Sequence, residues 1–300
     1  MDFLMLVPLA LFLDQLLGEP SRFHPLIGFG RLANWIESRM NRGVNLFSRG
    51  IAAWLVLVIP ISLTIYWLDS WLGGWWMGAL CGWLAIGWQS LRKHGVDVLQ
   101  ALNQNNLKDG RLKTSYLVSR DTSELDSSEL SKATIESILE NGSDAIFAPL
   151  FWLIILGAPG VVFYRLSNTL DAMWGYHNKQ FEQFGTFPAR IDDVLNYFPA
   201  RITASLYLLS GKRKSALQAW KTQGHNWYSP NAGVVMATGA GALMLKLGGN
   251  AIYHGKLKQR PDLGAGSQPT FADIRPALRL IDRSVYVILG LVFLSIFLSQ

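Results

Sequence analysis

Apolar residues are concentrated in four segments of this 300-residue chain, and each segment contains two charged residues at most. These segments are residues 1–17, 50–91, 145–166 and 284–300. A bilayer core of about 30 Å needs roughly 20 helical residues to cross it. The pattern therefore predicts a membrane protein, with spans at residues 3–17, 50–68, 73–91 and 285–298.

The apolar segment 145–166 is interrupted by Gly157-Ala158-Pro159-Gly160, in which glycine and proline disfavour a continuous helix. If this segment crossed the membrane, residues 167–283 with their 14 Lys and Arg would lie on the outer side. Short apolar segments are more often re-entrant or buried in protein than spanning. We therefore predict a re-entrant or core hairpin at residues 145–166.

Basic residues orient the predicted spans. Loop 18–49 contains five Arg and loop 92–144 contains seven Lys and Arg, whereas the turn 69–72 contains neither. Cytoplasmic loops carry an excess of these residues. We expect a multi-pass protein of the bacterial inner (cytoplasmic) membrane, with polar regions 92–144 and 167–283 in the cytoplasm.

The polar regions are patterned for helices. Asp126 followed by Ser127-Ser128-Glu129 forms a capping box that begins a helix, and Asn141-Gly142 is a typical helix end. Strand-like alternation is nearly absent, and residues 254–283 have the Pro and Gly content of a partly flexible connection. We predict an all-α fold in which residues 1–300 form a single membrane-integrated domain with a large helical cytoplasmic portion.

Composition excludes a disordered chain, a collagen-like repeat and a disulfide scaffold, and it argues against an ordinary cytosolic enzyme. Charged residues make up 16% of the chain, compared with about 25% in soluble domains, and there are 12 Trp. The net charge of +6 is explained by the basic loops, so membrane lipid is the expected partner and nucleic acid is not. The single Cys81 excludes an intrachain disulfide and a multi-cysteine metal site.

Three carboxylates are spaced to share one helix face: Glu136, Glu140 and Asp144. Like charges at this spacing repel, so a Mg²⁺ ion would stabilise the arrangement. A solvated acidic face would show the same spacing. Just upstream, Ser119-Arg120-Asp121-Thr122 combines a guanidinium with hydroxyls and a carboxylate, as a phosphate site does and as a polar turn also does.

A second polar set follows the apolar hairpin and consists of Asn168, Asp171, Asp192, Asp193 and Asn196. These residues are either ligands near the membrane surface or helix caps. Asp14 and His24 flank the first membrane exit, where an ionisable group is a functional candidate. Asn231 lies in a loop before a Gly/Ala-rich helix, and the chain has no P-loop motif.

Several sequence blocks occur in order along residues 10–265. They are Leu13-Asp14-Gln15-Leu16-Leu17-Gly18-Glu19-Pro20, His24-Pro25, Ser119-Arg120-Asp121-Thr122, Glu136-Ser137 through Asp144, Ala148-Pro149-Leu150-Phe151-Trp152, Tyr164-Arg165, Asn168-Thr169-Leu170-Asp171, Ala189-Arg190-Ile191-Asp192-Asp193, Pro199-Ala200-Arg201 and Ser229-Pro230-Asn231-Ala232-Gly233. This series resembles the CobD/CbiB family of cobalamin biosynthesis.

The resemblance implies an adenosylcobinamide-phosphate synthase, a ligase that forms a C–N bond. Its ATP-dependent reaction joins a carboxylate of the corrinoid adenosylcobyric acid to the amine of aminopropanol phosphate or ethanolamine phosphate. ATP would be a co-substrate and Mg²⁺ a cofactor, and other cobalamin-assembly membrane proteins are candidate partners.

Residue chemistry, rather than the resemblance, suggests the roles. The metal candidates are Glu136, Glu140 and Asp144. The candidates for binding substrate or phosphate are Arg120, Thr122, Asn168, Asp171, Arg190, Asn196, Asn231 and His24. The catalytic candidates are Asp121, which could bind metal or orient a substrate, and Asp192 and Asp193, which could act as a second metal site or as a base.

Two other functions are compatible with a membrane protein of this kind. A non-catalytic sensor of the distantly related AmpE type would not need the intact Asp, Glu and Arg blocks. A corrinoid transporter would need more spans and more polarity within the membrane.

Overall fold

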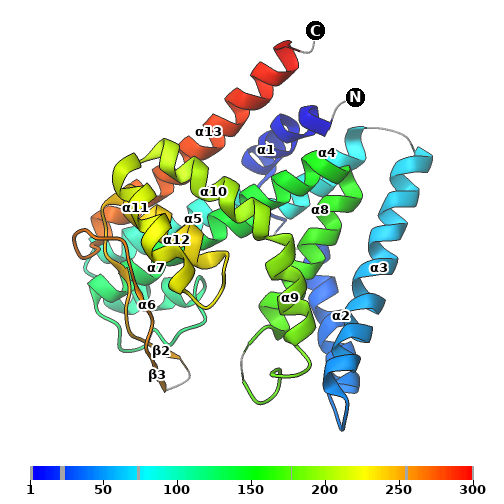
Figure 1. Cartoon of the computed structure of the whole chain (residues 1–300), viewed down its shortest axis with the longest axis horizontal. Coiled ribbons are helices and arrows are strands. Elements are labelled where there is room, and N and C mark those ends of the chain that lie inside the picture. The colour runs from blue at the N-terminus through cyan, green and yellow to red at the C-terminus, as the bar shows by residue number, and fades with distance from the viewer. Residues whose placement is uncertain (1–2, 21–23, 73–74, 177, 254–255, 299–300) are drawn as a thin grey trace. The chain divides into compact units, whose positions relative to one another are not determined.

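The chain is almost wholly helical in the computed structural model, which describes residues 3–20, 24–72, 75–176, 178–253 and 256–298 (Figure 1). The α-helices are α1 (Leu6–Leu17), α2 (Pro25–Met40), α3 (Leu46–Leu72), α4 (Trp75–Ala85), α5 (Trp88–Asn103), α6 (Leu107–Ser115), α7 (Ser127–Gly142), α8 (Ala148–Trp174), α9 (Thr186–Leu195), α10 (Tyr197–Ser210), α11 (Arg213–Gln223), α12 (Ala232–Leu243) and α13 (Ile274–Leu298). The predicted helical fold class is confirmed.

Short elements complete the chain. A π-helix (Ser143–Phe147) joins α7 to α8, and 3-10 turns lie at Phe3–Met5, Gly224–Asn226 and Phe271–Asp273. Two antiparallel strand pairs are formed by β1 (Leu247–Gly248) with β4 (Asp262–Leu263) and by β2 (Ala251–Tyr253) with β3 (Lys256–Lys258). The region predicted as a partly flexible connection, residues 254–283, therefore contributes β3 and β4, one strand of each pair.

Contacts divide the chain into two compact units, and the single membrane-integrated domain stays a prediction. Unit 1 consists of residues 1–87 and 144–196, and unit 2 of residues 88–143 and 197–300. In unit 1, helices α3, α8 and α9 pack around Trp54. The Trp54 ring meets Phe163 and Phe187 edge to face, with ring centroids 5.6 and 5.5 Å away.

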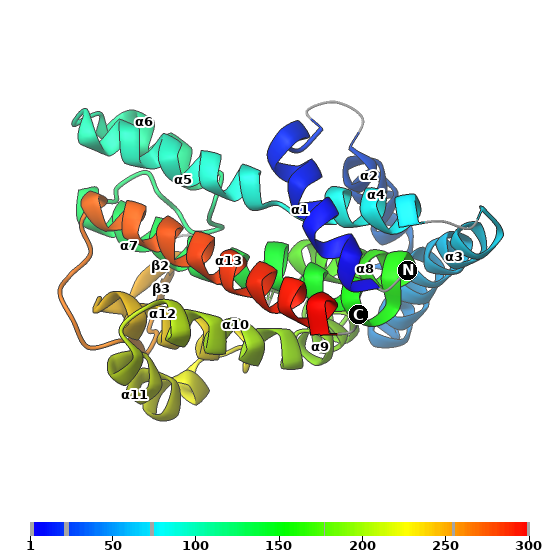
Figure 2. The ribbon, with the colours of Figure 1, turned by 90° about the horizontal axis from the view of Figure 1, so that it is seen from above.

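In unit 2, α7 is the central helix. It packs against α5, α6, α12 and α13, and Figure 2 shows α13 running along it. Leu130, Ile135, Ile138 and Leu139 are fully buried on it. The Tyr207 hydroxyl on α10 donates a hydrogen bond of 2.8 Å to the Leu139 carbonyl oxygen.

The predicted start and the predicted end of α7 are both confirmed. Glu129 N–H donates to Asp126 Oδ1 at 2.8 Å, and Asp126 N–H donates to Glu129 Oε2 at 2.9 Å, which is a capping box. Gly142 is the last residue of the α-helix, and the backbone continues beyond it as the π-helix Ser143–Phe147. A Cβ at Gly142 would lie 2.4 Å from the Tyr207 hydroxyl oxygen, so this glycine also permits close packing.

Three helical segments are long and apolar enough to cross a membrane: Leu46–Leu72, Ser127–Trp174 and Phe271–Leu298. They include the predicted spans 50–68 and 285–298, and the shorter α1 coincides with the predicted span 3–17. The run 73–91 is not one helix, because the chain leaves helical geometry at Ile86-Gly87. There Gly87 N–H donates to the Ala145 carbonyl oxygen at 2.9 Å. Residues 73 and 74 lie outside the described residues.

The interruption predicted within residues 145–166 is present. Gly157 has φ 65° and ψ −148°, and two helical pieces of α8 meet there in a kink. This backbone region is essentially confined to glycine, because a Cβ would clash with neighbouring backbone atoms. The re-entrant topology itself stays a prediction.

We expect Gly157→Ala to destabilise the protein by roughly 1–3 kcal/mol, because alanine would be strained at this φ and ψ. Thermal unfolding of the detergent-solubilised chain would measure the effect. Gly290→Ala on α13 is a matched control, since a Cβ there meets no atom within 4 Å. An equal melting temperature for wild type and Gly157→Ala would contradict the strain argument.

Candidate functional site

A polar cavity of about 280 Å³ lies within unit 2. Its wall is made by the chain before α7, by one face of α7, and by four residues of the C-terminal half. The lining residues are Leu117, Val118, Ser119, Arg120, Glu136, Ser137, Glu140, Asn141, Trp227, Tyr228, Met236 and Arg260. The structure therefore brings together three of the predicted site residues, Arg120, Glu136 and Glu140.

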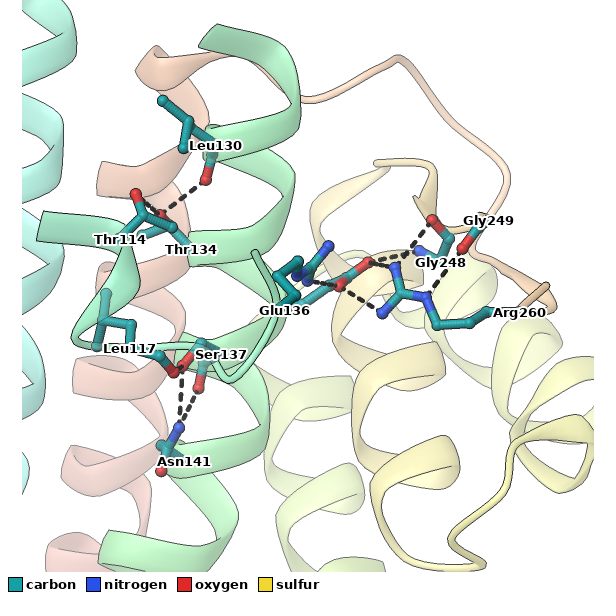
Figure 3. Close-up of polar contacts among 11 residues, drawn as sticks. Thr114, Leu117, Leu130, Thr134, Glu136, Ser137, Asn141, Gly248, Gly249 and Arg260 are labelled. Carbon is teal, nitrogen blue, oxygen red and sulfur yellow. Dashed lines mark hydrogen bonds and ion pairs between the residues drawn. The ribbon is translucent and has the colours of Figure 1, made fainter. Parts of the chain in front are cut away.

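Glu136 is buried on α7 and is surrounded by donors (Figure 3). Arg260 donates from Nη1 to Oε2 at 3.0 Å and from Nη2 to Oε1 at 3.2 Å. Gly248 N–H donates to Oε1 at 2.8 Å, and Arg120 Nη2 donates to Oε2. Burying a charge is costly unless it is paired and hydrogen-bonded, and this carboxylate meets both conditions.

Arg260 is held in place by a glycine turn. Its Nε donates to the Gly249 carbonyl oxygen at 2.9 Å, and its guanidinium lies 5.2 Å from the centre of the Trp227 ring. Gly248 and Gly249 have φ values of 74° and 71°, which favour glycine. A Cβ on Gly248 would lie 2.1 Å from the Pro261 carbonyl oxygen. The turn thus requires glycine for conformation and for space.

The loop that carries Arg120 is fixed to α7 by neutral hydrogen bonds, also drawn in Figure 3. Ser137 Oγ donates to the Leu117 carbonyl oxygen at 2.8 Å, and Asn141 Nδ2 donates to Ser137 Oγ at 3.0 Å. Arg120 has five N–H donors, and within the described part of the chain its hydrogen bond goes to Glu136. Donors of Arg120 therefore remain for an anionic ligand in the cavity.

The predicted metal set is not assembled by this geometry. The Glu136 oxygens accept from two arginines and a backbone N–H, and Asp144 lies in the π-helix that follows α7. Among the described residues, no group of three or more His, Cys, Asp or Glu is arranged to hold a metal ion.

Other residues predicted in this half of the chain make structural contacts. Thr122 is buried and donates to the Arg111 carbonyl oxygen at 3.0 Å. Asp121 is exposed and accepts from Ser123 N–H at 2.9 Å, a hydrogen bond that lowers the pKa of Asp121. Asn231 is buried before α12 and accepts from Arg201 Nη1 at 2.6 Å.

The second predicted set forms a network within unit 1. Asn168 Nδ2 donates to Asp192 Oδ1 at 3.1 Å, and Asn196 Nδ2 donates to Asp192 Oδ2 at 2.9 Å. Asn196 Oδ1 accepts from the Tyr164 hydroxyl at 3.0 Å, and Asn168 Oδ1 accepts from Arg165 Nη1 at 3.3 Å. Burial raises the pKa of Asp192 to about 6, against the effect of the two asparagine hydrogen bonds.

The remaining candidates of unit 1 lie around this network or apart from it. Asp171 and Asp193 are partly buried, and Arg190 is exposed on α9. His24 is buried at the start of α2, where its Nδ1 accepts from Leu26 N–H at 3.1 Å. Burial is the main cause of a lowered pKa of His24. His24 lines a second, apolar cavity in this unit.

Sequence reasoning missed Arg260 and gave no role to Arg165. Arg260 lies 124 residues from Glu136 in a segment whose composition indicates a loop, so no local pattern reveals the pairing. Arg165 carried a signal, because it is the single charged residue within an apolar segment and such residues are functional candidates.

Comparison with known proteins identifies relatives along the whole chain. A family model described as CobD/Cbib protein matches residues 7–281. The cobalamin biosynthesis protein CobD of Stutzerimonas stutzeri is 54% identical over 276 residues, which are 91% of each chain. The protein of the same name from Chromobacterium violaceum is 47% identical over 304 residues, covering 96% of this chain and 95% of the relative.

A more distant relative, the cobalamin biosynthesis protein CobD of Mycobacterium tuberculosis, is 37% identical over 276 residues, or 89% of this chain and 88% of its own. No solved structure shows significant similarity to the chain.

We expect Glu136→Gln to destabilise the protein by about 3–5 kcal/mol, because it leaves two buried guanidinium groups without their carboxylate. The melting temperature of the detergent-solubilised chain would measure the loss. Glu124→Gln, which changes an exposed side chain, should shift stability by less than about 0.5 kcal/mol. Equal effects of the two substitutions would show that the buried cluster adds nothing to stability.

The raised pKa of Asp192 predicts a pH dependence of stability. Because the folded pKa is about 6 and an unfolded aspartate titrates near 3.9, the folded state keeps its proton to higher pH. The contribution of Asp192 to the free energy of unfolding is therefore fully present below about pH 4. It falls by up to roughly 3 kcal/mol as the pH rises to 6 and above. Melting temperatures of wild type and Asp192→Asn across pH 4–7 would test this, since the variant should lack this slope. Parallel curves would contradict it.

Proposed function

The chain belongs to the CobD/CbiB family and has a role in cobalamin biosynthesis, and we propose that it is an adenosylcobinamide-phosphate synthase. In the proposed reaction, ATP drives the joining of a carboxylate of adenosylcobyric acid to the amine of aminopropanol phosphate or ethanolamine phosphate. The product amide is adenosylcobinamide phosphate or its ethanolamine counterpart.

The polar cavity of unit 2 is the observation that supports this proposal. An aminoalcohol phosphate carries an ammonium group at one end and a phosphate at the other. Arg120 has donors left for the phosphate, and Glu140 and Asn141 offer oxygen acceptors to the ammonium group. The volume of about 280 Å³ suits this small zwitterion, since pockets for drug-sized ligands occupy 300–1,000 Å³.

The chemistry requires activation before the amide bond forms. A free carboxylate is a poor electrophile, so its oxygen first attacks the γ-phosphorus of ATP and gives an acyl phosphate with release of ADP. The amine then attacks the acyl carbon, a C–N bond forms, the C–O bond to phosphate breaks, and inorganic phosphate leaves. The ammonium group must lose a proton before it attacks, and Glu140 is the proposed acceptor.

Guanidinium groups would provide the electrostatic stabilisation that the proposed reaction needs. Arg120 would stabilise negative charge on phosphoryl oxygens that approach the cavity. Glu136, whose carboxylate accepts hydrogen bonds from Arg120 and Arg260, would hold both guanidinium groups in fixed positions. Little reorganisation would then be needed when substrate binds. Glu136 thereby acts as a positioning residue in this scheme.

A resident Mg²⁺ site at Glu136, Glu140 and Asp144 does not fit the donor set, because the Glu136 oxygens already accept from arginine and backbone groups. We propose Mg²⁺ only as the ion that accompanies the phosphates of ATP, which it binds with few protein ligands.

The proposed location is the bacterial inner membrane, with the catalytic region in the cytoplasm where ATP is available. The three long apolar helices fit a membrane protein. Basic loops 18–49 and 92–144 support the cytoplasmic orientation.

The proposal is tested with the detergent-solubilised full chain supplied with adenosylcobyric acid, aminopropanol phosphate, ATP and Mg²⁺. Mass spectrometry should detect the amide product. Glu140→Gln should lower kcat by about 10²–10⁴-fold, because a neutral amide cannot accept the ammonium proton. Glu124→Gln is the matched control and should keep wild-type turnover.

Two outcomes would contradict the proposal at different levels. A folded wild-type protein that binds the corrinoid but yields no amide would be a sensor or a transporter. Full activity of Glu140→Gln would leave the family activity intact and exclude the cavity as its catalytic site.

A further inference from the structure

A second cavity, of about 390 Å³, lies within unit 1 and has almost wholly apolar walls. Side chains of α2, α3, α4 and α8 form it, among them Phe29, Ile61, Ile65, Leu84 and Val162. It shares no lining residue with the polar cavity of unit 2. The proposed ligase reaction makes no use of it.

The cavity belongs to a region of membrane-like composition. Two of its lining helices, α3 and α8, are in segments long and apolar enough to cross a bilayer. A charged side chain in such a helix is costly and usually has a partner or a function. Arg165 on α8 is such a side chain, and it lines the cavity.

Arg165 is incompletely compensated within the described part of the chain. Its buried Nε has no hydrogen-bond partner there, and no carboxylate forms an ion pair with it. Its Nη1 donates to Asn168 Oδ1 at 3.3 Å, and the Asn168 amide in turn donates to Asp192. The Asp192 carboxyl, which interacts electrostatically with Arg165, is therefore joined to the guanidinium through a neutral amide.

His24, the other basic residue that lines the cavity, does not compensate the positive charge of Arg165. Its Nδ1 accepts a backbone N–H, and Glu19 Oε1 lies 3.9 Å from its Nε2. Burial and the nearby Arg165 both lower the pKa of His24, so the ring is largely neutral at pH 7. Arg165 thus gives an apolar cavity a permanent positive charge at its wall.

We propose that this cavity binds one acyl chain of an anionic phospholipid, with the lipid phosphate paired to Arg165. The apolar walls match a hydrocarbon chain, and the volume lies in the range of small-molecule sites. A net negative headgroup offsets the guanidinium charge and satisfies its unused donors. A zwitterionic lipid brings its own cation, so it binds less well.

Gly28 on α2 provides a way to close the cavity without disturbing its surroundings. It lines the cavity, and a Cβ at this position would meet no atom within 4 Å. Gly28→Leu therefore fills open space and also favours the helix, since glycine is a poor helix former. Gly290→Leu on α13 is the matched control, because Gly290 is equally unobstructed and lines neither cavity.

The test is native mass spectrometry of the full chain, purified in detergent and incubated with phosphatidylglycerol and phosphatidylcholine of identical acyl chains. The wild type should retain one phosphatidylglycerol and prefer it at least tenfold over phosphatidylcholine. Gly28→Leu should reduce this retention at least tenfold, whereas Gly290→Leu should retain lipid as the wild type does. Arg165→Gln should abolish the preference, and Arg165→Lys should keep most of it.

Equal retention of both lipids by the wild type would mean non-specific annular lipid and would overturn the proposal. So would undiminished retention by Gly28→Leu with an unchanged melting temperature. Neither result depends on amide synthesis, so the lipid site and the proposed ligase activity can fail separately.

Discussion

A carboxylate can be buried in a helical core only where donors and cations replace the water it has lost, and Glu136 on α7 sets this condition for unit 2. Meeting it requires Arg120 from the preceding loop, Arg260 from the C-terminal half and the N–H of Gly248. The glycine turn, the short β1–β4 ribbon and the stacking of Arg260 on Trp227 all follow from placing these groups. Arg120, Glu136 and Arg260 of this cluster also line the polar cavity.

In unit 1, buried charged groups are not paired directly. Asp192 and Arg165 are linked through the neutral amide of Asn168 instead of a direct ion pair. Burial raises the pKa of Asp192, and Arg165 has a buried Nε without a partner among the described residues. Direct pairing in unit 2 gives rigidity, whereas indirect pairing in unit 1 leaves charge available to a ligand or a proton.

Structural features could be predicted from the sequence where they depend on residues close together in the chain. The capping box at Asp126 and the break at Gly157 are both visible as short patterns, because a cap and a φ of 65° depend on neighbouring residues. The grouping of Arg120 with Glu136 and Glu140 also followed from nearby positions. Local patterns failed at Arg260, whose partner Glu136 is 124 residues away in the sequence. The carboxylate face of α7 was predicted to hold a metal ion, but Glu136 pairs with arginines instead, and one of them, Arg260, is too distant in sequence to be predicted.

The long separation between Glu136 and Arg260 has a consequence for how the protein is made. Synthesis proceeds at about 5–20 residues per second, so the 124 residues between the two partners take roughly 6–25 s to add. During that interval α7 carries a carboxylate with Arg120 as its one early partner, and burial of Glu136 is unfavourable until the ribosome has passed Arg260. Unit 2 is thus completed late in translation, and a chain truncated before residue 260 would remain dependent on chaperones or be degraded.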